Sequence, residues 1–471
     1  MTVTVERNKI FLPIVGMLQQ IAFVPALFLA VVSSEYPLFG KLAWLALMII
    51  CGFNIHFAFY AVFFFSAFFI PTVFTTRIFF TIKHFHISLA ILLAVFSLKG
   101  YLFHKIKKNL KSILIFIPWF AILFISVISS IVYRQPPSAL SMTANILSLV
   151  ISYSFLICIL DGKKEIFLNA LLFFVFGGCI RIILAGVKSF FDWPVSRFAE
   201  PLIHNTHIGF LASSSLFLLL PFILTKQDFK KQLVSWPMLL VVSLGLLLSC
   251  SRTAWSSALI SYFLFCILLF FFQHTNCLPK LQIPIKWFIT GVSFLFFVLL
   301  LLGMLWSQEM VDRLAALQFF LERDYWQYIF QDQQNFGPFG FFRLAQFSVI
   351  KHILKHSFLF GIGLSREVTD FHCLYLTLFG GTGFIGLFLF LSFCFAWAKS
   401  LFVQIFQRID DLNLFRIGVL CAFSVWLISS LMETFMIQFN VWIVLTAGIV
   451  LARRNTYKNS NVGQVQIHED K

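Results

Sequence analysis

The sequence predicts an all-α, polytopic integral membrane protein with roughly 12–14 transmembrane helices and one amphipathic periplasmic segment. Of its 471 residues, 60% are hydrophobic and only 11% are charged, which is too little polar material for the surface of a soluble fold. Apolar runs close to the roughly 20 residues that cross a hydrocarbon core recur along the chain. Because backbone groups in lipid must bond to one another, such uninterrupted runs are expected to be helices.

The segmentation before Lys111 is left open. The first predicted span, Ile10–Val32, follows a short polar start and lacks a convincing small-residue cleavage site, so we expect it to be retained. The stretch Leu38–Phe74 is compatible with two spans divided at Gly52–Asn54. The cationic piece Thr75–His86 fits poorly on the outer face of the membrane.

The later apolar runs are well separated, and each is long enough to cross the bilayer. The expected spans are Ser112–Tyr133, Leu140–Leu160, Ile166–Val187, Thr206–Leu224, Leu233–Cys250, Thr253–Phe272, Lys286–Trp306, Phe371–Trp397, Leu414–Leu431 and Phe435–Ala452.

Cationic side chains alternate between successive loops. Lysine-dense loops are expected at His104–Lys111, Asp161–Glu165, Thr225–Gln232, Gln273–Lys286, around Lys399 and Arg408, and at Arg453–Lys458. By the positive-inside rule these loops face the cytoplasm, and both termini lie on the same side. The net charge of +16 therefore reports orientation and does not indicate a nucleic-acid partner.

The segment Ser307–Asp370 is the one long stretch outside the expected spans, and its hydrophobic residues recur at helical spacing. We expect it to lie on the periplasmic membrane surface. The chain then divides into a membrane region 1–306, the amphipathic segment 307–370, the C-terminal membrane helices 371–452 and a cytoplasmic tail 453–471.

Three stretches combine unusual polar residues with a position on the predicted outer face. They are Leu246–Trp255 (LLLSCSRTAW), Phe341–Gly363 (FFRLAQFSVIKHILKHSFLFGIG) and Thr369–Gly386 (TDFHCLYLTLFGGTGFIG). Singly, each has an ordinary explanation, such as an interfacial arginine that reaches lipid phosphate or a histidine that is satisfied at a helix start. The order of the three stretches is more specific than any one of them.

The three stretches contain, in this order, an apolar helix ending in SR(T/G), an outer segment with R-L-x-(W/Q) leading into H-x-x-x-F-G-I-G, and a His before G-x-x-G-x-x-G. This order of motifs resembles the O-antigen ligase and O-antigen polymerase superfamily. The resemblance runs from about Glu200 to Gly386 and extends to the helix layout. Two positions depart from the usual pattern, since Cys373 stands where Asn commonly follows the His and Gln346 stands where Trp is common.

The resemblance implies a glycosyltransferase of the bacterial inner membrane that works without a metal, another cofactor or a nucleotide sugar. Its donor would be a glycan on a polyprenyl-diphosphate carrier, taken at the periplasmic face, and its acceptor a hydroxyl of lipid A-core, both presented in membrane lipid. A related polymerase that extends the lipid-linked chain is the alternative, and a protein O-oligosaccharyltransferase is a more distant one. A transporter would be favoured by inverted repeats or acidic mid-membrane segments, and the sequence contains neither.

The resemblance also assigns expected roles to residues. A diphosphate leaving group without a metal needs fixed cations, and arginine contacts phosphate oxygens at two points. Arg252 and Arg343 are expected to grip the diphosphate, with Arg313 as a weaker third candidate. His372 is expected to be the general base for the acceptor hydroxyl, or alternatively a group that orients it.

Several further residues are substrate-binding or metal candidates of lower rank. Arg181 lies in an apolar span, where it either faces the same cavity or pairs with polar neighbours. Gly361 and Gly363 of the FGIG motif are candidate substrate-binding positions. His352 and His356 are spaced i, i+4 but lack a third ligand nearby, so no metal site is expected.

Overall fold

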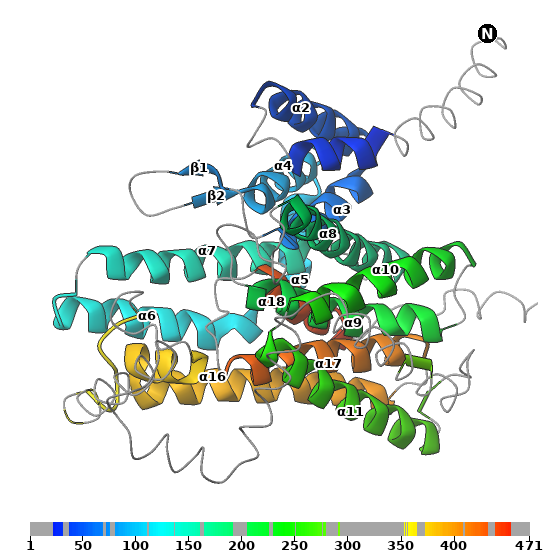
Figure 1. The fold of residues 1–471 in the computed structure, drawn as a ribbon. Coiled ribbons are helices and arrows are strands. Elements are labelled where there is room, and N and C mark those ends of the chain that lie inside the picture. The colour runs from blue at the N-terminus through cyan, green and yellow to red at the C-terminus, as the bar shows by residue number, and fades with distance from the viewer. Residues whose placement is uncertain are drawn as a thin grey trace, which may run out of the picture.

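The computed structural model describes residues 22–31, 37–68, 72–75, 81–110, 113–135, 137–160, 164–191, 205–225, 229–249, 251–275, 277–278, 291–292, 353, 355, 357–364, 373–407, 410–431 and 439–453. These residues form a bundle of helices with one short β-hairpin (Figure 1). Eight of their helices are long and apolar enough to cross a membrane, and five shorter apolar helices accompany them. The predicted fold class, an all-α multi-pass membrane protein, is confirmed.

The helix Ala22–Val31 comes first in the described part of the chain. The elements that follow are α2 (Pro37–Phe53), α3 (Ile55–Ser66), β1 (Thr72–Thr75), β2 (Thr81–Lys83), α4 (His84–Leu98), α5 (Leu102–Asn109), the 3₁₀ turn η3 (Leu114–Phe116), α6 (Ile117–Val132), α7 (Pro137–Ile159), α8 (Lys164–Phe191), α9 (Asn205–Leu224), α10 (Phe229–Leu248), α11 (Arg252–His274), α16 (Leu374–Gln407), α17 (Leu412–Ser429) and α18 (Phe439–Ala452). The expected span Lys286–Trp306 lies outside the described residues apart from 291–292.

The described part of the N-terminal region consists of short helices and a hairpin. Asn54 separates α2 from α3 with an extended backbone (φ −132°, ψ 107°), and its side-chain oxygen accepts a 3.0 Å hydrogen bond from the His56 amide. A helix break therefore lies at the expected division Gly52–Asn54, with Asn54 as the N-cap of α3. The two helices, of 17 and 12 residues, are both shorter than those that are long enough to cross a membrane, so two separate spans are not shown. The cationic piece Thr75–His86 contains strand β2, which pairs antiparallel with β1, and the start of α4.

One of the lysine-dense loops is a helix. The expected loop His104–Lys111 overlaps α5, which is a short helix and not an irregular connection. Leu102 packs against the hydrophobic core, whereas Lys107 is exposed. An amphipathic helix of this kind keeps its cations in the polar layer while its apolar side contacts the bundle. Its lysines can therefore still be counted as loop charges in the positive-inside rule.

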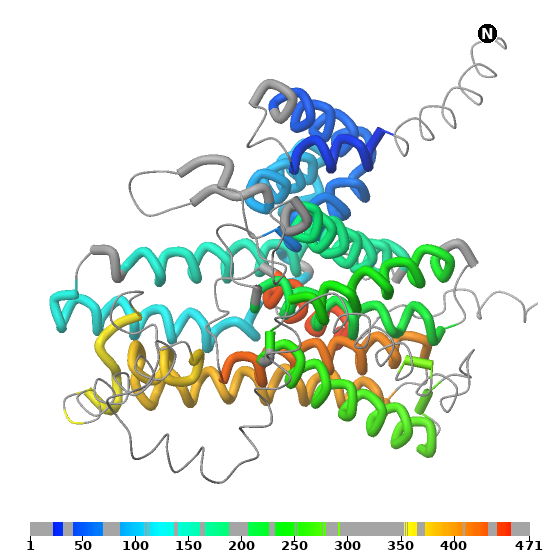
Figure 2. Tube along the Cα trace, in the orientation of Figure 1, coloured from blue at the N-terminus to red at the C-terminus, as the bar shows by residue number. Residues whose placement is uncertain are grey.

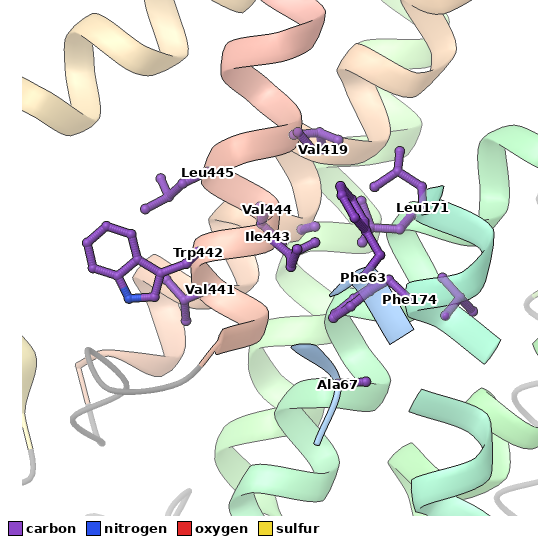
Figure 3. Close-up of a cluster of buried hydrophobic side chains, with 14 of the residues drawn as sticks. Phe63, Ala67, Leu171, Phe174, Val419, Val441, Trp442, Ile443, Val444 and Leu445 are labelled. Atoms are coloured by element: carbon purple, nitrogen blue, oxygen red, sulfur yellow. The ribbon is translucent and has the colours of Figure 1, made fainter. Parts of the chain in front are cut away.

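The interior of the bundle is closely packed and strongly aromatic. The first half of α18, including Val441–Leu445, lies among side chains of α3, α8 and α17, with Phe63 and Phe174 facing it (Figure 3). By contrast, large apolar side chains such as Phe124, Ile267 and Phe395 are exposed on the outside of α6, α11 and α16. Outward apolar faces of this kind fit a lipid surrounding.

The expected single span Phe371–Trp397 is wrong, because α16 consists of two arms joined at Gly383. Gly383 has a backbone conformation (φ 67°, ψ −166°) that no helix contains. The rings of Tyr375 and Phe390 lie 6.1 Å apart between centroids, although the two residues would be about 22 Å apart along an unbroken helix. The first arm, which ends at Thr382, therefore folds back along the second arm (Figure 2).

The far end of the second arm is joined to its neighbours by a buried polar cluster. Arg416 is 1% exposed and forms an ion pair of 2.7 Å with Asp410, while its Nε atom donates to the Leu451 carbonyl at 3.1 Å. Asn413 donates to the Ile405 carbonyl at 3.2 Å. The cluster ties α16, α17 and α18 together at the end of the second arm opposite Gly383.

Candidate functional site

The loop Ser357–Leu364 crosses α16 at its break and makes backbone hydrogen bonds to both arms. The Ile362 and Gly363 amides donate to the Gly380 and Gly381 carbonyls of the first arm at 2.9 and 2.8 Å. In the opposite direction, the Phe384 and Ile385 amides of the second arm donate to the Phe358 and Leu359 carbonyls at 2.9 and 3.2 Å. The loop thus replaces hydrogen bonds that the helix loses at Gly383.

Glycine is required where the loop crosses its neighbours. Gly361 has φ +67°, and a Cβ atom there would lie 2.5 Å from the Gly381 carbonyl carbon. Gly363 has φ +99°, and a Cβ atom there would collide with the side chain of Ser130 on α6. Both conformations lie in the left-handed half of the Ramachandran map that glycine favours. Both expected substrate-binding glycines are therefore buried at crossings of protein backbone.

Two serines of α6 hold the same loop from its other side. Ser129 Oγ donates to the Phe360 carbonyl at 2.8 Å, and Ser126 Oγ accepts from the Leu364 amide at 3.0 Å. Ser126 Oγ also lies 2.9 Å from Thr143 Oγ1 of α7. The loop is consequently fixed between α6 and α16 by side-chain bonds as well as backbone bonds.

The first arm of α16 starts on the end of α17. The Leu374 amide donates to the Ser430 carbonyl at 2.8 Å, and Tyr375 Oη donates to the Leu427 carbonyl at 2.9 Å. Next to this contact, Ser429 Oγ donates to Ser257 Oγ of α11 at 2.9 Å. The end of α17 therefore joins the beginnings of α11 and α16.

This junction brings two of the sequence motifs together. Arg252 is the first residue of α11, and Ser257 lies in the second turn of the same helix. His372 precedes Leu374 by two positions in the sequence. The structure thus brings the helix that Arg252 opens and the helix that follows His372 onto one structural element, the end of α17. The Arg252 side chain and His372 itself lie outside the described residues.

A third helix begins at the same place. A Cβ atom on Gly209, one turn into α9, would lie 2.6 Å from the side chains of Ser249 and Ala254, so α9 approaches the start of α11 very closely. Ser251 caps α11 by accepting a 3.2 Å hydrogen bond from the Ala254 amide. Helix N termini carry partial positive charge. The starts of α9, α11 and α16 thus create a region that favours an anion.

Arg181 is buried in α8 and contacts the end of α3. Its side chain is 4% exposed, and Nη1 donates to the Ala67 carbonyl at the end of α3 at 2.8 Å. A cation on the last carbonyls of a helix is favourable, because these groups carry partial negative charge. Of the two expectations for Arg181, pairing with polar neighbours is the one that this contact matches.

The other candidate site residues predicted from the sequence lie outside the part of the chain that the structure describes. Arg313, Arg343, His352 and His356 lie outside the described residues. So does most of the amphipathic segment 307–370, of which Ser357–Leu364 is packed into the bundle as described above. Within the described part of the chain, no three His, Cys, Asp or Glu side chains gather in a way that would hold a metal ion.

The sequence motifs did not include the serines that organise this region. Ser126, Ser129, Ser257 and Ser429 all lie in apolar helices, where a hydroxyl is usually bonded to its own helix. The one available clue is the grouping of small hydroxyl residues, as in the SVISS sequence of α6, because such residues often mark helix contacts in membranes. Comparison with protein-family models and with curated proteins finds no match to this chain.

Proposed function

We propose that the protein is a metal-independent glycosyltransferase of the O-antigen ligase type. It takes a glycan from a polyprenyl-diphosphate carrier and joins it to a hydroxyl of lipid A-core. The carrying observation is the junction at the end of α17, where the Ser429–Ser257 and Ser430–Leu374 hydrogen bonds unite the helix that starts with Arg252 and the helix that follows His372. The resemblance of the three motifs supplies the reaction class.

In this proposal Arg252 and Arg343 grip the diphosphate, and Arg313 assists them. The partial positive charge of the helix starts around Arg252 adds to the field that holds a leaving anion in place. His372 takes the proton of the acceptor hydroxyl as a general base. Gly361 and Gly363 shape the surroundings by allowing backbones to cross, a task that agrees with their buried positions.

The proposal places the protein in the bacterial inner membrane with the glycine crossing on the periplasmic side. The lysine-dense loops support this orientation, because the end of α6 and the start of α7 lie between two of them in the sequence. The loop Ser357–Leu364 contacts that end of α6. Both substrates of the proposed reaction are amphiphiles that reach the site within the membrane.

A deletion strain tests the reaction class on one lipopolysaccharide gel. Loss of a ligase leaves core without any attached chain, while carrier-linked polymer accumulates. Loss of a polymerase leaves core that bears a single repeat, and this pattern would replace the ligase assignment by the polymerase. An unchanged gel would contradict both.

Complementation with point variants tests the division of roles. Arg252→Lys is expected to fail almost as completely as Arg252→Ala, because an ammonium keeps the charge but loses the two-point contact with phosphate. His372→Ala should lower turnover by roughly 10² to 10⁴-fold while donor binding survives. Arg134→Lys is the matched control, since Arg134 is exposed at the end of α6 and belongs to no motif.

Protein level and insertion are measured for each variant, because Arg252 stands where two helices meet. Near-normal glycan transfer by correctly inserted Arg252→Lys would contradict the two-point contact. Loss of donor binding in step with activity in His372→Ala would assign His372 to binding and remove its role as general base.

A further inference from the structure

The outer third of α6 contacts the glycine loop through two hydroxyl groups that serve another part of the chain. Several buried serines in the described part of the chain bond to a carbonyl of their own helix, as Ser154 Oγ does with the Val150 carbonyl at 2.6 Å. Ser129 Oγ instead donates to the carbonyl of Phe360, which lies far away in the sequence. Ser126 Oγ accepts from the Leu364 amide at the other end of the same loop segment.

The two serines supply hydrogen-bond partners to a loop whose Gly361, Gly363 and Leu364 are buried while Phe358–Phe360 are exposed on the apolar outside of the bundle. In such surroundings no water replaces a lost partner, so each backbone group needs one within the protein. The loop uses its own amides and carbonyls for the two arms of α16, at Gly380, Gly381, Phe384 and Ile385. For the Phe360 carbonyl and the Leu364 amide, α6 supplies the partners.

The loop in turn determines where α16 turns back. It bonds to both arms on either side of Gly383, and a Cβ atom on Gly383 would collide with the Leu359 carbonyl. The arm from Leu374 to Thr382 is a helix about 13 Å long. Because a helix is stiff, the position of Gly383 at one end of the arm determines the position of Leu374 at the other end. Leu374 is the residue by which the arm rests on Ser430 of α17.

We propose that Ser126 and Ser129 are positioning residues of the glycan-transfer reaction. They hold the loop Ser357–Leu364 against α6, the loop holds the turn of α16, and the first arm then brings Leu374, two positions after His372 in the sequence, to the end of α17 that also contacts α11. This inference rests on the proposed function. It adds two residues that touch neither substrate and that no motif contains.

The test measures transfer kinetics and amide exchange on the same full-length proteins. Ser126→Ala and Ser129→Ala should each lower kcat by roughly 10 to 100-fold, because misplacing reacting groups by about 1 Å has an effect of this size. The KM for the lipid-linked donor should change by less than about twofold, as expected when positioning and not binding is lost. Ser129→Thr retains a hydroxyl and should restore most of kcat, whereas Ser154→Ala is the matched control and should behave as wild type.

Hydrogen exchange reports on the loop without requiring turnover. The amides of Gly361–Leu364 and of Phe384 and Ile385 should exchange faster in both alanine variants than in wild type or Ser154→Ala. Wild-type kcat in the two alanine variants, or unchanged exchange of these amides, would overturn the inference. A drop in kcat that only follows the amount of folded protein, without rescue by Ser129→Thr, would overturn it as well.

The kinetic and exchange measurements together distinguish failure of the positioning role from failure of the proposed function. If the wild-type protein transfers no glycan, the proposed function fails, and the positioning role in that reaction fails with it. The exchange data still decide whether the two serines hold the loop. If the wild type transfers glycan and the serine variants do so equally well, only the positioning inference fails.

Discussion

Replacement of Gly383 by alanine tests the folded-back form of α16 directly. The conformation of Gly383 (φ 67°, ψ −166°) belongs to a region that is almost restricted to glycine, and another residue there costs about 1–3 kcal/mol. The new methyl group would also overlap the Leu359 carbonyl and the Phe360 amide. Relief of this overlap must move the loop and break the bonds from Phe384 and Ile385, each worth about 0.5–1.5 kcal/mol. The expected loss in the free energy of unfolding is about 2–6 kcal/mol.

The chain contains two matched controls for this substitution. Gly100 has a similar φ of +69° but nothing within 4 Å of an added Cβ atom, so Gly100→Ala should show backbone strain alone. Gly52 lies in α2, also with open space around it, and Gly52→Ala should be neutral or stabilise by up to about 1 kcal/mol. Unfolding is followed by titrating dodecyl sulfate into detergent-solubilised protein. If Gly383→Ala is no less stable than Gly100→Ala, the loop does not press against the turn of α16 as the structure describes.

Three further outcomes are expected. Alkaline phosphatase fused near Gln334 should be active and a fusion after Arg454 inactive, and the reverse pattern would invert the topology. Asp410→Asn should lower the free energy of unfolding by about 3 kcal/mol or more, because it leaves the 1% exposed Arg416 cation without its carboxylate, whereas Arg416→Leu should cost less because the Asp410 side chain left behind is 32% exposed. In donor-free protein, Arg252→Gln should raise the free energy of unfolding by about 0.3–1 kcal/mol while transfer is lost, since a cation in the first turn opposes the helix dipole; a lower stability would contradict this account.

The fold class followed from the sequence because the bilayer imposes a length and a composition on each span. The expected span Ser112–Tyr133 contains α6, and Leu140–Leu160 nearly coincides with α7. The division at Gly52–Asn54 was also predictable, since Asn is a strong N-cap and favours a local break. Such features depend on neighbouring residues, which a sequence displays directly.

The turn of α16 was missed because it depends on distant residues. Several glycines in an apolar helix predict close packing against a neighbour as well as they predict a break. Only the loop Ser357–Leu364, by bonding to both arms, makes the break favourable at Gly383. Ser126 and Ser129 were missed for the same reason, because nothing in the sequence of α6 shows that their partners are Leu364 and Phe360.

In the proposed reaction the junction at the end of α17 would hold the anionic diphosphate. Arg252 occupies the first position of α11, where the helix dipole disfavours a cation, and the starts of α9 and α16 add partial charges of the same sign. Within a membrane such a concentration of positive charge is costly unless it is compensated. A diphosphate bound there would supply the compensation, and its departure as an anion would be stabilised by groups that need not move. In the proposed site Arg252 would thus differ from Arg181, whose Nη1 atom donates to the Ala67 carbonyl at the negative end of α3.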